Sequence, residues 1–200
     1  MKIIDDITTL EALYGQPGEA SLIKVAKSMT PEYRAWIMAS RFCVLSTVGP
    51  GGTDGSPRGD VEPVVKERDA RTLLMPDWRG NNRMDSLRNI VADGRVSLMF
   101  MIPGRTNVIR VNGTAVVCVD RDLLEQFEQK GQHPRSVVVI TIAEIYSQCA
   151  RAVMRSGLWD GDLDLDLPSM GEILKAQKGG DFDGSTYDND WADRAKKTMW

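Results

Sequence analysis

The chain has 200 residues, with 25 Lys and Arg against 28 Asp and Glu, a formal net charge of −3 and a pI of about 5.3. This length suits one ordinary domain with a substantial core, and the acidic balance excludes a general nucleic-acid binder, which needs a surplus of Lys and Arg. No apolar window approaches the roughly 18 residues of a membrane span, and the N-terminus lacks a signal pattern, so we expect a cytoplasmic protein without a membrane partner.

The first forty residues are predicted to be helical and to form an outer layer packed on the rest of the chain. Helical patterns cover residues 10–14 and 19–26. A third helix is expected from Thr30-Pro31-Glu32, where Thr caps and Pro occupies the first turn.

From Arg41 onward the chain has the composition of β-strands, with short runs of Val, Leu, Ile and Phe broken by Gly and Pro. We place strands at residues 42–48, 59–65, 72–75, 96–101, 107–119 and 136–146, with a Gly- and Pro-rich loop at 49–55. Helices are predicted at 82–92 and at 121–130, the second capped by Asp120. Several strands with two intervening helices favour a mostly antiparallel barrel with flanking helices, an α+β fold.

The last forty residues are predicted to be an extension with short helices. The acidic stretch 160–166 suggests a solvated connector, a short helix follows near 171–177, and the glycines of 179–184 suggest a mobile segment. Residues 187–200 form either a docking helix or a tail. The chain therefore divides into residues 1–40, 41–160 and 161–200.

The cysteines and the histidine limit the chemistry that the chain can carry. Cys43, Cys118 and Cys149 are far apart and each lies in or beside an apolar run, so we expect reduced, buried thiols. His133 is the one histidine, in a turn-like segment. A zinc site or a Cys-His couple has almost nothing to be built from, and no residue stands out as a general acid or base.

The segment from Met75 to Asn89 carries the strongest chemical signal. It runs from a strand through a polar turn into the start of an amphipathic helix, where free N–H groups and the helix dipole favour an anion. Three arginines and two asparagines surround this place and suit a phosphate: Arg79, Arg83, Arg88, Asn81 and Asn82. Alternatively, the asparagines only cap the helix, and the arginines are solvated or paired with Asp77 and Asp85.

The motifs S-P-R-G-D, G-N-N-R-M-D-S-L-R-N and R-V-N-G, with a later R-S-G-L-W, resemble one branch of the pyridoxamine 5'-phosphate oxidase-like family. The similarity covers about residues 41–160. It implies a split β-barrel that binds FMN at the interface of a homodimer.

The resemblance also implies which residues hold the cofactor. Arg58 would reach the phosphate or the ring edge, Gly59 and Asp60 would let the backbone pass close to the flavin, and Met75, Pro76 and Asp77 would lie along the ring. Asn82 and Arg83 match a basic pair that grips the phosphate, with Asn81 beside them, and Asn replaces the first basic residue of that pair. Asn107 would contact the pyrimidine side. From the second subunit, Arg155, Ser156 and Trp159 would form the far wall.

Structural alternatives stay open for several of these residues. Arg58 could pair with Glu62, Asn107 could cap a strand end, and Trp159 could serve core or dimer packing. For Asn112-Gly113 a hairpin turn or a bulge is favoured over ligand contact.

FMN itself performs hydride or electron transfer, so the resemblance implies an FMN-dependent oxidoreductase acting on an unidentified small molecule, with NADH or NADPH as candidate donors. The C-terminal sequence lacks the basic, Trp-containing signature of the vitamin B6 oxidase, which argues against that substrate. Two other functions are compatible with the sequence: a non-catalytic flavin carrier or redox sensor, and a barrel that has lost flavin and binds another cofactor or a protein.

Overall fold

The computed structural model describes residues 1–161 and 165–199. Parts of the predicted acidic connector (160–166) and of the predicted final segment (187–200) lie outside the described residues. None of the helices in the described ranges is long and apolar enough to cross a membrane.

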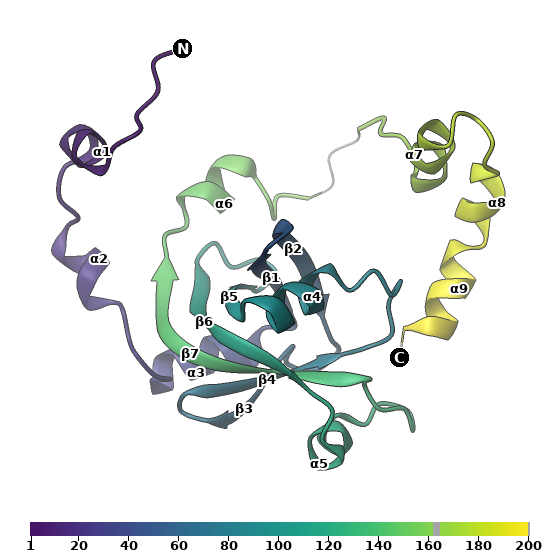
Figure 1. Cartoon of the computed structure of the whole chain (residues 1–200), viewed down its shortest axis with the longest axis horizontal. Helices are drawn as coiled ribbons and strands as arrows, with labels where there is room; N and C mark the ends of the chain where they lie inside the picture. Colours follow the sequence, from purple (N-terminus) through teal and green to yellow (C-terminus); the bar gives the residue numbers. More distant parts are fainter. Residues whose placement is uncertain (162–164, 200) are drawn as a thin grey trace.

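Three short helices precede the sheet: α1 (Ile7–Tyr14), α2 (Glu19–Ile23) and α3 (Pro31–Ala39). Helix α3 begins as predicted, because the Thr30 hydroxyl accepts a hydrogen bond from the Tyr33 N–H at 3.3 Å and Pro31 occupies the first turn. Ile37 of α3 is fully buried, whereas α1 and α2 contain no buried residue. Figure 1 shows α1 standing away from the barrel. Within a single chain, the predicted packing of the N-terminal helices on the rest of the molecule is therefore provided by α3.

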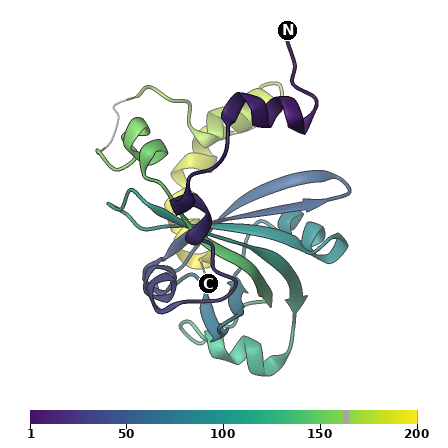
Figure 2. The same ribbon diagram turned by 90° about the vertical axis from the view of Figure 1, so that its left-hand side faces the viewer.

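The centre of the molecule is one antiparallel sheet of seven strands in the order β2-β1-β5-β6-β7-β4-β3. The strands are β1 (Phe42–Gly49), β2 (Gly52–Gly59), β3 (Lys66–Asp69), β4 (Thr72–Asp77), β5 (Arg95–Met101), β6 (Val108–Cys118) and β7 (Ser136–Gln148). Figure 2 shows the sheet curling on itself, and β2 and β3 are its two edges. The sheet is not closed by hydrogen bonds between these edges. This is the predicted mostly antiparallel split barrel with flanking helices.

The second strand was predicted in the wrong place. The structure has β2 at Gly52–Gly59, inside the expected loop, and residues 60–65 are not a strand. A tight turn joins Gly49 to Gly52, whose φ of 120° suits glycine. Because β2 is an edge strand that pairs only with β1 in the described sheet, it tolerates Pro57 and several glycines. The edge strand β3 was not predicted, because its sequence, Lys-Glu-Arg-Asp, is wholly charged.

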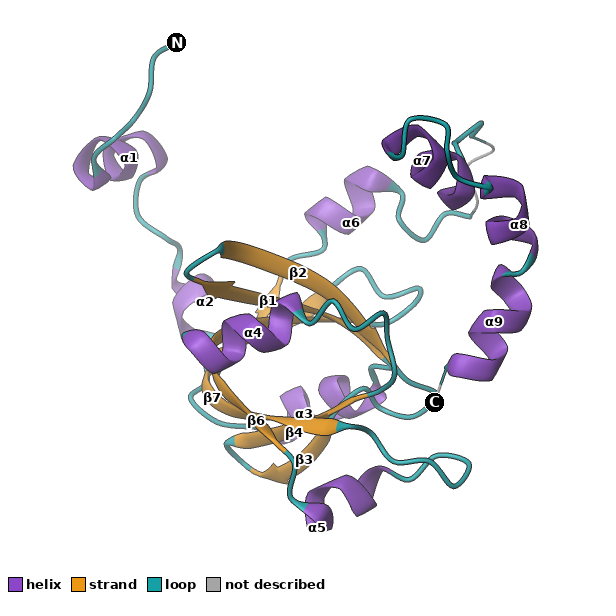
Figure 3. Ribbon diagram, turned by 45° about the vertical axis from the view of Figure 1, so that its right-hand side comes forward, coloured by secondary structure: helices purple, strands orange, loops and turns teal. Residues whose placement is uncertain are grey.

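Two helices pack against or beside the sheet, and both are shorter than predicted. Helix α4 (Asp85–Ala92) packs on β1, β2 and β6, as Figure 3 shows. It begins three residues later than expected, because Asn82 and Met84 both have a φ of 60°, outside the helical region. Helix α5 (Arg121–Leu124) continues only as a 3₁₀ turn, Glu125–Phe127, and the Asp120 side chain makes no capping hydrogen bond.

The core lies inside the curled sheet and is almost entirely aliphatic. Its fully buried members come from α3 and from six strands or their flanks, and include Ile37, Leu45, Val65, Leu73, Leu98, Val111, Ile140 and Ile145. The predicted bulge is present between Asn112 and Gly113 of β6. A Cβ on Gly113 would lie 2.0 Å from the Thr141 carbonyl oxygen, so β6 and β7 meet there at a distance only glycine allows.

Among the described residues after the sheet there are four helices: α6 (Arg151–Ser156), α7 (Met170–Gln177), α8 (Gly184–Asn189) and α9 (Trp191–Thr198). The predicted helix near 171–177 is therefore confirmed as α7. Residues 169–199, with the last three of these helices, form the C-terminal arm. In Figure 1 the arm stands on the side of the barrel opposite to α1. Its described residues bury only Gly171 and Gly184.

Candidate functional site

A cavity of about 1050 Å³ lies beside the split of the barrel. Its walls are β2 and the residues after it, the end of β4, the turn 78–84, the start of α4, and two residues of the C-terminal arm. Most of the residues predicted for a cofactor site line this one cavity: Arg58, Gly59, Asp60, Pro76, Asp77, Asn81, Asn82 and Arg83. The structure thus brings together predicted residues up to 25 positions apart in the chain, from Arg58 to Arg83.

The cavity forms where side chains bridge the open sheet. Strands β2 and β4 are separated by four other strands in the sheet order, yet Arg58 Nη1 of β2 lies 2.5 Å from Asp77 Oδ1 of β4. Beside this pair, the indole N–H of Trp78 donates to Asp60 Oδ2 at 2.9 Å. Charged and aromatic side chains therefore connect the β2 and β4 sides of the split, which are not paired through the backbone.

Arg58 is the least solvent-exposed cation of the cavity for which an ion pair is present. The side chains of Arg58 and Asp77 are 19% and 16% exposed. The Nε of Arg58 is buried and has no hydrogen-bond partner within the described part of the chain. A buried donor without a partner is costly, and the residue that carries this donor lines the cavity. Arg58 pairs with Asp77, so the alternative partner Glu62 is not the one found.

The thiol of Cys43 lies in the sheet directly opposite Arg58 in the β1–β2 register. Burial raises its pKa to about 12, while the charge of Arg58 acts in the opposite direction. Cys43 is therefore a neutral thiol in the core wall behind the cavity.

The turn 78–84 is shaped by its two asparagines. Asn81 Oδ1 accepts from the Arg83 N–H at 3.0 Å, and Asn82 Oδ1 accepts from the Arg135 guanidinium at 2.7 Å. Arg83 forms an ion pair with Asp85, and its side chain is 79% exposed. The alternative in which Arg83 pairs with Asp85 is thus the one present, while neither asparagine side chain caps α4 itself.

The remaining predicted residues do not line the cavity in a single chain. Met75 is 1% exposed in the core, and Asn107 is exposed just before β6. Arg155 and Ser156 lie on α6, and the Trp159 indole N–H donates to the Arg105 carbonyl oxygen at 2.8 Å. The role expected for these late residues belongs to a second subunit and stays a prediction.

Several cavity residues were missed by the sequence analysis. Asp54 accepts a hydrogen bond from Ser86 of α4, and Arg135 precedes β7, the strand that pairs with β4. Trp191 and Met199 come from the arm. The sequence pattern that could have pointed to these two residues is the spacing of Trp191, Ala195 and Met199, which places them on one face of a helix.

The expectation of three buried cysteines is wrong. Cys43 is buried, Cys118 is half-buried and Cys149 is exposed. Cys118 is the last residue of β6, and Cys149 follows the last residue of β7.

Comparisons with known proteins identify the family and the fold. The family model described as pyridoxamine 5'-phosphate oxidase matches residues 29–149, more than half of the chain. Comparison with curated proteins gave no match.

Solved structures with the same fold are distant in sequence. A variant of HupZ from Group A Streptococcus has a TM-score of 0.50 at 18% identity, with 60% of this chain and 98% of that chain covered. General Stress Protein 26 from Bacillus anthracis has a TM-score of 0.42 at 19% identity, covering 56% and 88%. An FMN-binding protein from Syntrophomonas wolfei has 0.41 at 15% identity, covering 58% and 80%. At these identities the likeness concerns the fold.

Proposed function

Because the chain belongs to the pyridoxamine 5'-phosphate oxidase family, we propose that it binds FMN in this cavity and is an FMN-dependent oxidoreductase acting on a small molecule. The observation that carries the proposal is that one cavity gathers Arg58, whose buried Nε has no hydrogen-bond partner in the described part of the chain, with Asp77 and the turn residues Asn82 and Arg83. The resemblance assigns all four of these residues to the cofactor.

The residues present fit such a ligand. The cavity volume of about 1050 Å³ is at the upper end of the range for small-molecule sites. Four arginines line it, Arg58, Arg79, Arg83 and Arg135, and guanidinium groups suit phosphate oxygens. No hydrogen bond or ion pair of Arg79 is found within residues 1–161 and 165–199, so a cation is available beside the turn. Pro57, Pro76 and Trp78 add apolar surface for a flat ring.

Bound FMN would supply the hydride or electron transfer. The chain's own residues would bind and orient it. Asp77 holds the Arg58 guanidinium in place from β4, and Asp60 holds the Trp78 indole. Each carboxylate reaches across the split, Asp77 from the end of β4 to Arg58 of β2 and Asp60 from beyond β2 to Trp78, so both of these side chains are held in place within a single chain.

We also propose that two copies of the chain share the site. One chain leaves the cavity open, and Arg155, Ser156 and Trp159 lie outside it, so a partner copy would bring them to the far wall. A twofold interface closes two such sites at once. Light scattering that gives a monomer retaining FMN tightly would contradict the shared site.

Colour and reduction test the function directly. The purified chain, supplied with FMN, should be yellow, and its flavin absorbance should disappear on anaerobic addition of NADH or NADPH and return with an acceptor. A bound flavin that neither NADH nor NADPH reduces favours the non-catalytic carrier or sensor. A protein that does not bind FMN contradicts both functions.

The phosphate position is tested by replacing one of two exposed arginines. Arg83→Ala removes a cation from the cavity turn, and we expect FMN affinity to fall roughly tenfold or more, the range for a charge-assisted hydrogen bond. Arg105→Ala is the matched control, because Arg105 is exposed and lies outside the cavity. Equal dissociation constants for the two variants would show that the phosphate binds elsewhere.

A further inference from the structure

The C-terminal arm reaches the cavity with both ends of its last helix. Trp191, the first residue of α9, and Met199, which follows the helix, both line the cavity. Residues at the two ends of a helix of eight residues lie roughly 12 Å apart along its axis. Helix α9 therefore runs along the rim of the cavity.

The Trp191 ring is supported from within the arm. Tyr187 stacks with it at a centroid distance of 6.5 Å and an interplanar angle of 25°. The Arg194 guanidinium lies 4.5 Å from the Tyr187 centroid and 5.4 Å from the Trp191 centroid. Phe182 contacts Tyr187 at 5.7 Å and extends the group. These contacts support the indole ring, but they do not bury it in a hydrophobic core.

The arm itself is held by specific local contacts. A capping box joins Ser169 and Glu172 at the start of α7, and the Gly171 N–H donates to Asp188 Oδ1 of α8 at 2.8 Å. Gly171 and Gly184 meet with no room for a Cβ at either position. Helix α8, which carries Tyr187, thus has a defined position against α7, and Trp191 on α9 stacks on that tyrosine.

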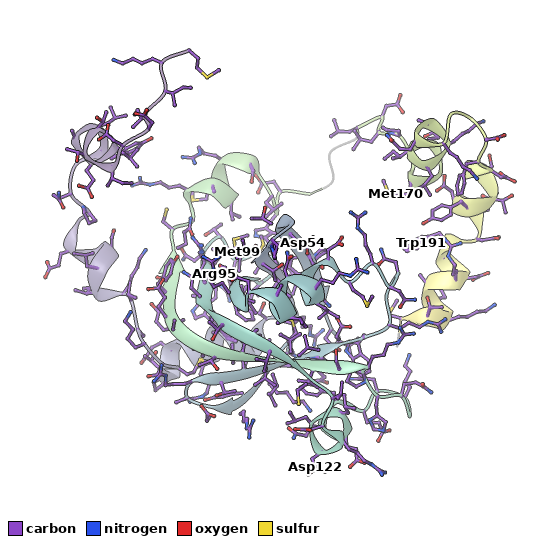
Figure 4. All side chains as sticks on the ribbon, viewed as in Figure 1. Asp54, Arg95, Met99, Asp122, Met170 and Trp191 are labelled. Atoms are coloured by element: carbon purple, nitrogen blue, oxygen red, sulfur yellow. The ribbon has the colours of Figure 1, made fainter. Side chains whose placement is uncertain are left out.

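Trp191 is nevertheless 56% exposed, and Figure 4 shows it on the side of the arm that faces the barrel. A large aromatic ring that is supported from within the arm, exposed and turned towards a cavity is suited to stack on a flat ligand. Across the cavity, the barrel presents Pro57, Pro76 and Trp78.

We propose that Trp191 is a cofactor-positioning residue of the same chain, whose indole stacks on the flavin ring held in the cavity. This inference rests on the proposed function. It gives α9 of the same chain a place at the rim of the cavity, in addition to the far wall proposed for a partner copy. The arm lies outside residues 29–149 of the family match. The inference also predicts that the indole quenches the emission of bound flavin, because a stacked indole donates an electron to excited isoalloxazine.

The test compares full-length variants loaded with FMN. Trp191→Ala should weaken FMN binding roughly three- to tenfold, as expected for loss of one aromatic stacking contact, and should increase the emission of the bound flavin. Trp191→Phe should keep most of the affinity. Lys197→Ala is the matched control, since Lys197 is exposed on the same helix and lies outside the cavity.

The outcomes separate the two proposals. If the wild-type chain does not bind FMN, the proposed function is wrong. If the wild type binds FMN and Trp191→Ala matches Lys197→Ala in both affinity and flavin emission, the function stands and the role of Trp191 is wrong. Far-ultraviolet circular dichroism of each variant verifies that the arm is still helical, and Trp191→Phe, which preserves the contact with Tyr187, separates ring stacking from arm folding.

Discussion

The barrel and the C-terminal arm both contribute to the cavity, but they are stabilised in different ways. The barrel buries its aliphatic residues through strand pairs distant in sequence, such as β1 with β5 and β4 with β7. The arm buries two glycines and is held by helix caps, one close helix contact and a row of aromatic rings. We infer that the barrel unfolds as one cooperative unit, while the arm can open at much lower cost. A binding site with one rigid wall and one separately folded wall can admit a large cofactor without unfolding the rigid part.

The largest effect is expected where two barrel strands meet most closely. In Gly113→Ala the new Cβ would lie 2.0 Å from the Thr141 oxygen and 3.0 Å from its carbonyl carbon, so the backbone of β6 or β7 must move. We expect a loss of about 3 to 5 kcal/mol in the free energy of unfolding, or no folded protein. Urea unfolding followed by tryptophan fluorescence measures it.

Gly55→Ala provides the control for this substitution. A Cβ at Gly55, on the edge strand β2, would have no heavy atom within 4 Å. It should change stability by less than about 1 kcal/mol, with a small gain expected from the less flexible unfolded chain. A loss of stability in Gly113→Ala that is as small as the change in Gly55→Ala would show that the bulge is not tightly packed in solution.

A smaller and local effect is expected from the equivalent change in the arm. In Gly171→Ala the Cβ would lie 2.1 Å from the Gly184 oxygen, so α7 and α8 must separate. Because little of the core depends on this contact, the main unfolding transition should shift by less than about 0.5 kcal/mol. Trypsin should, however, cleave after Lys175 and Lys178 several times faster than in the wild type.

Ser185→Ala, at an exposed position of α8, should leave the cleavage rate unchanged. If Gly171→Ala destabilises the whole chain as much as Gly113→Ala, the arm is part of the cooperative unit and does not open separately from the barrel.

The same contrast explains which features could be predicted from sequence. Long apolar strands such as β5, β6 and β7 were placed to within one or two residues, because alternating burial leaves a strong pattern. Strand β2 was misplaced because its formation depends on pairing with β1 and on an exposed edge, neither of which its Gly- and Pro-containing sequence reveals. The late start of α4 depends on left-handed residues, Asn82 and Met84, that no periodicity indicates.

The candidate site divides in the same way. The polar turn around Asn82 and Arg83 was found because its residues are contiguous and chemically distinctive. The pairing of Arg58 with Asp77 requires β2 and β4, which are four strands apart in the sheet order, to approach across the split, and this depends on the whole fold. Trp191 was missed because the arm follows a charged connector and carries no family motif, so only its position in space connects it with the cavity.

A small, pH-dependent effect is expected from an ion pair that joins α3 to the barrel edge. Arg34 contacts Glu67 of β3 through two hydrogen bonds of 2.5 and 2.6 Å, and the hydrogen bond from Arg34 lowers the pKa of Glu67. A carboxyl group with a lowered folded-state pKa stabilises the fold above its unfolded pKa of about 4.3 and loses that contribution as the pH falls through the folded value.

Glu67→Gln should therefore cost about 0.5 to 1 kcal/mol at pH 7, the range for an accessible ion pair, and the difference from wild type should shrink below pH 4. Urea unfolding at pH 7 and at pH 3 measures both values. A pH-independent effect of Glu67→Gln would mean that the pair with Arg34 does not form in solution, and α3 would then be held to the barrel by its apolar face alone.

The corresponding carboxylate in the arm is Asp183, which caps α8. The hydrogen bond from the backbone N–H of Thr186 lowers the pKa of Asp183. Asp183→Asn should therefore alter tryptic cleavage of the arm and leave the main unfolding transition in place.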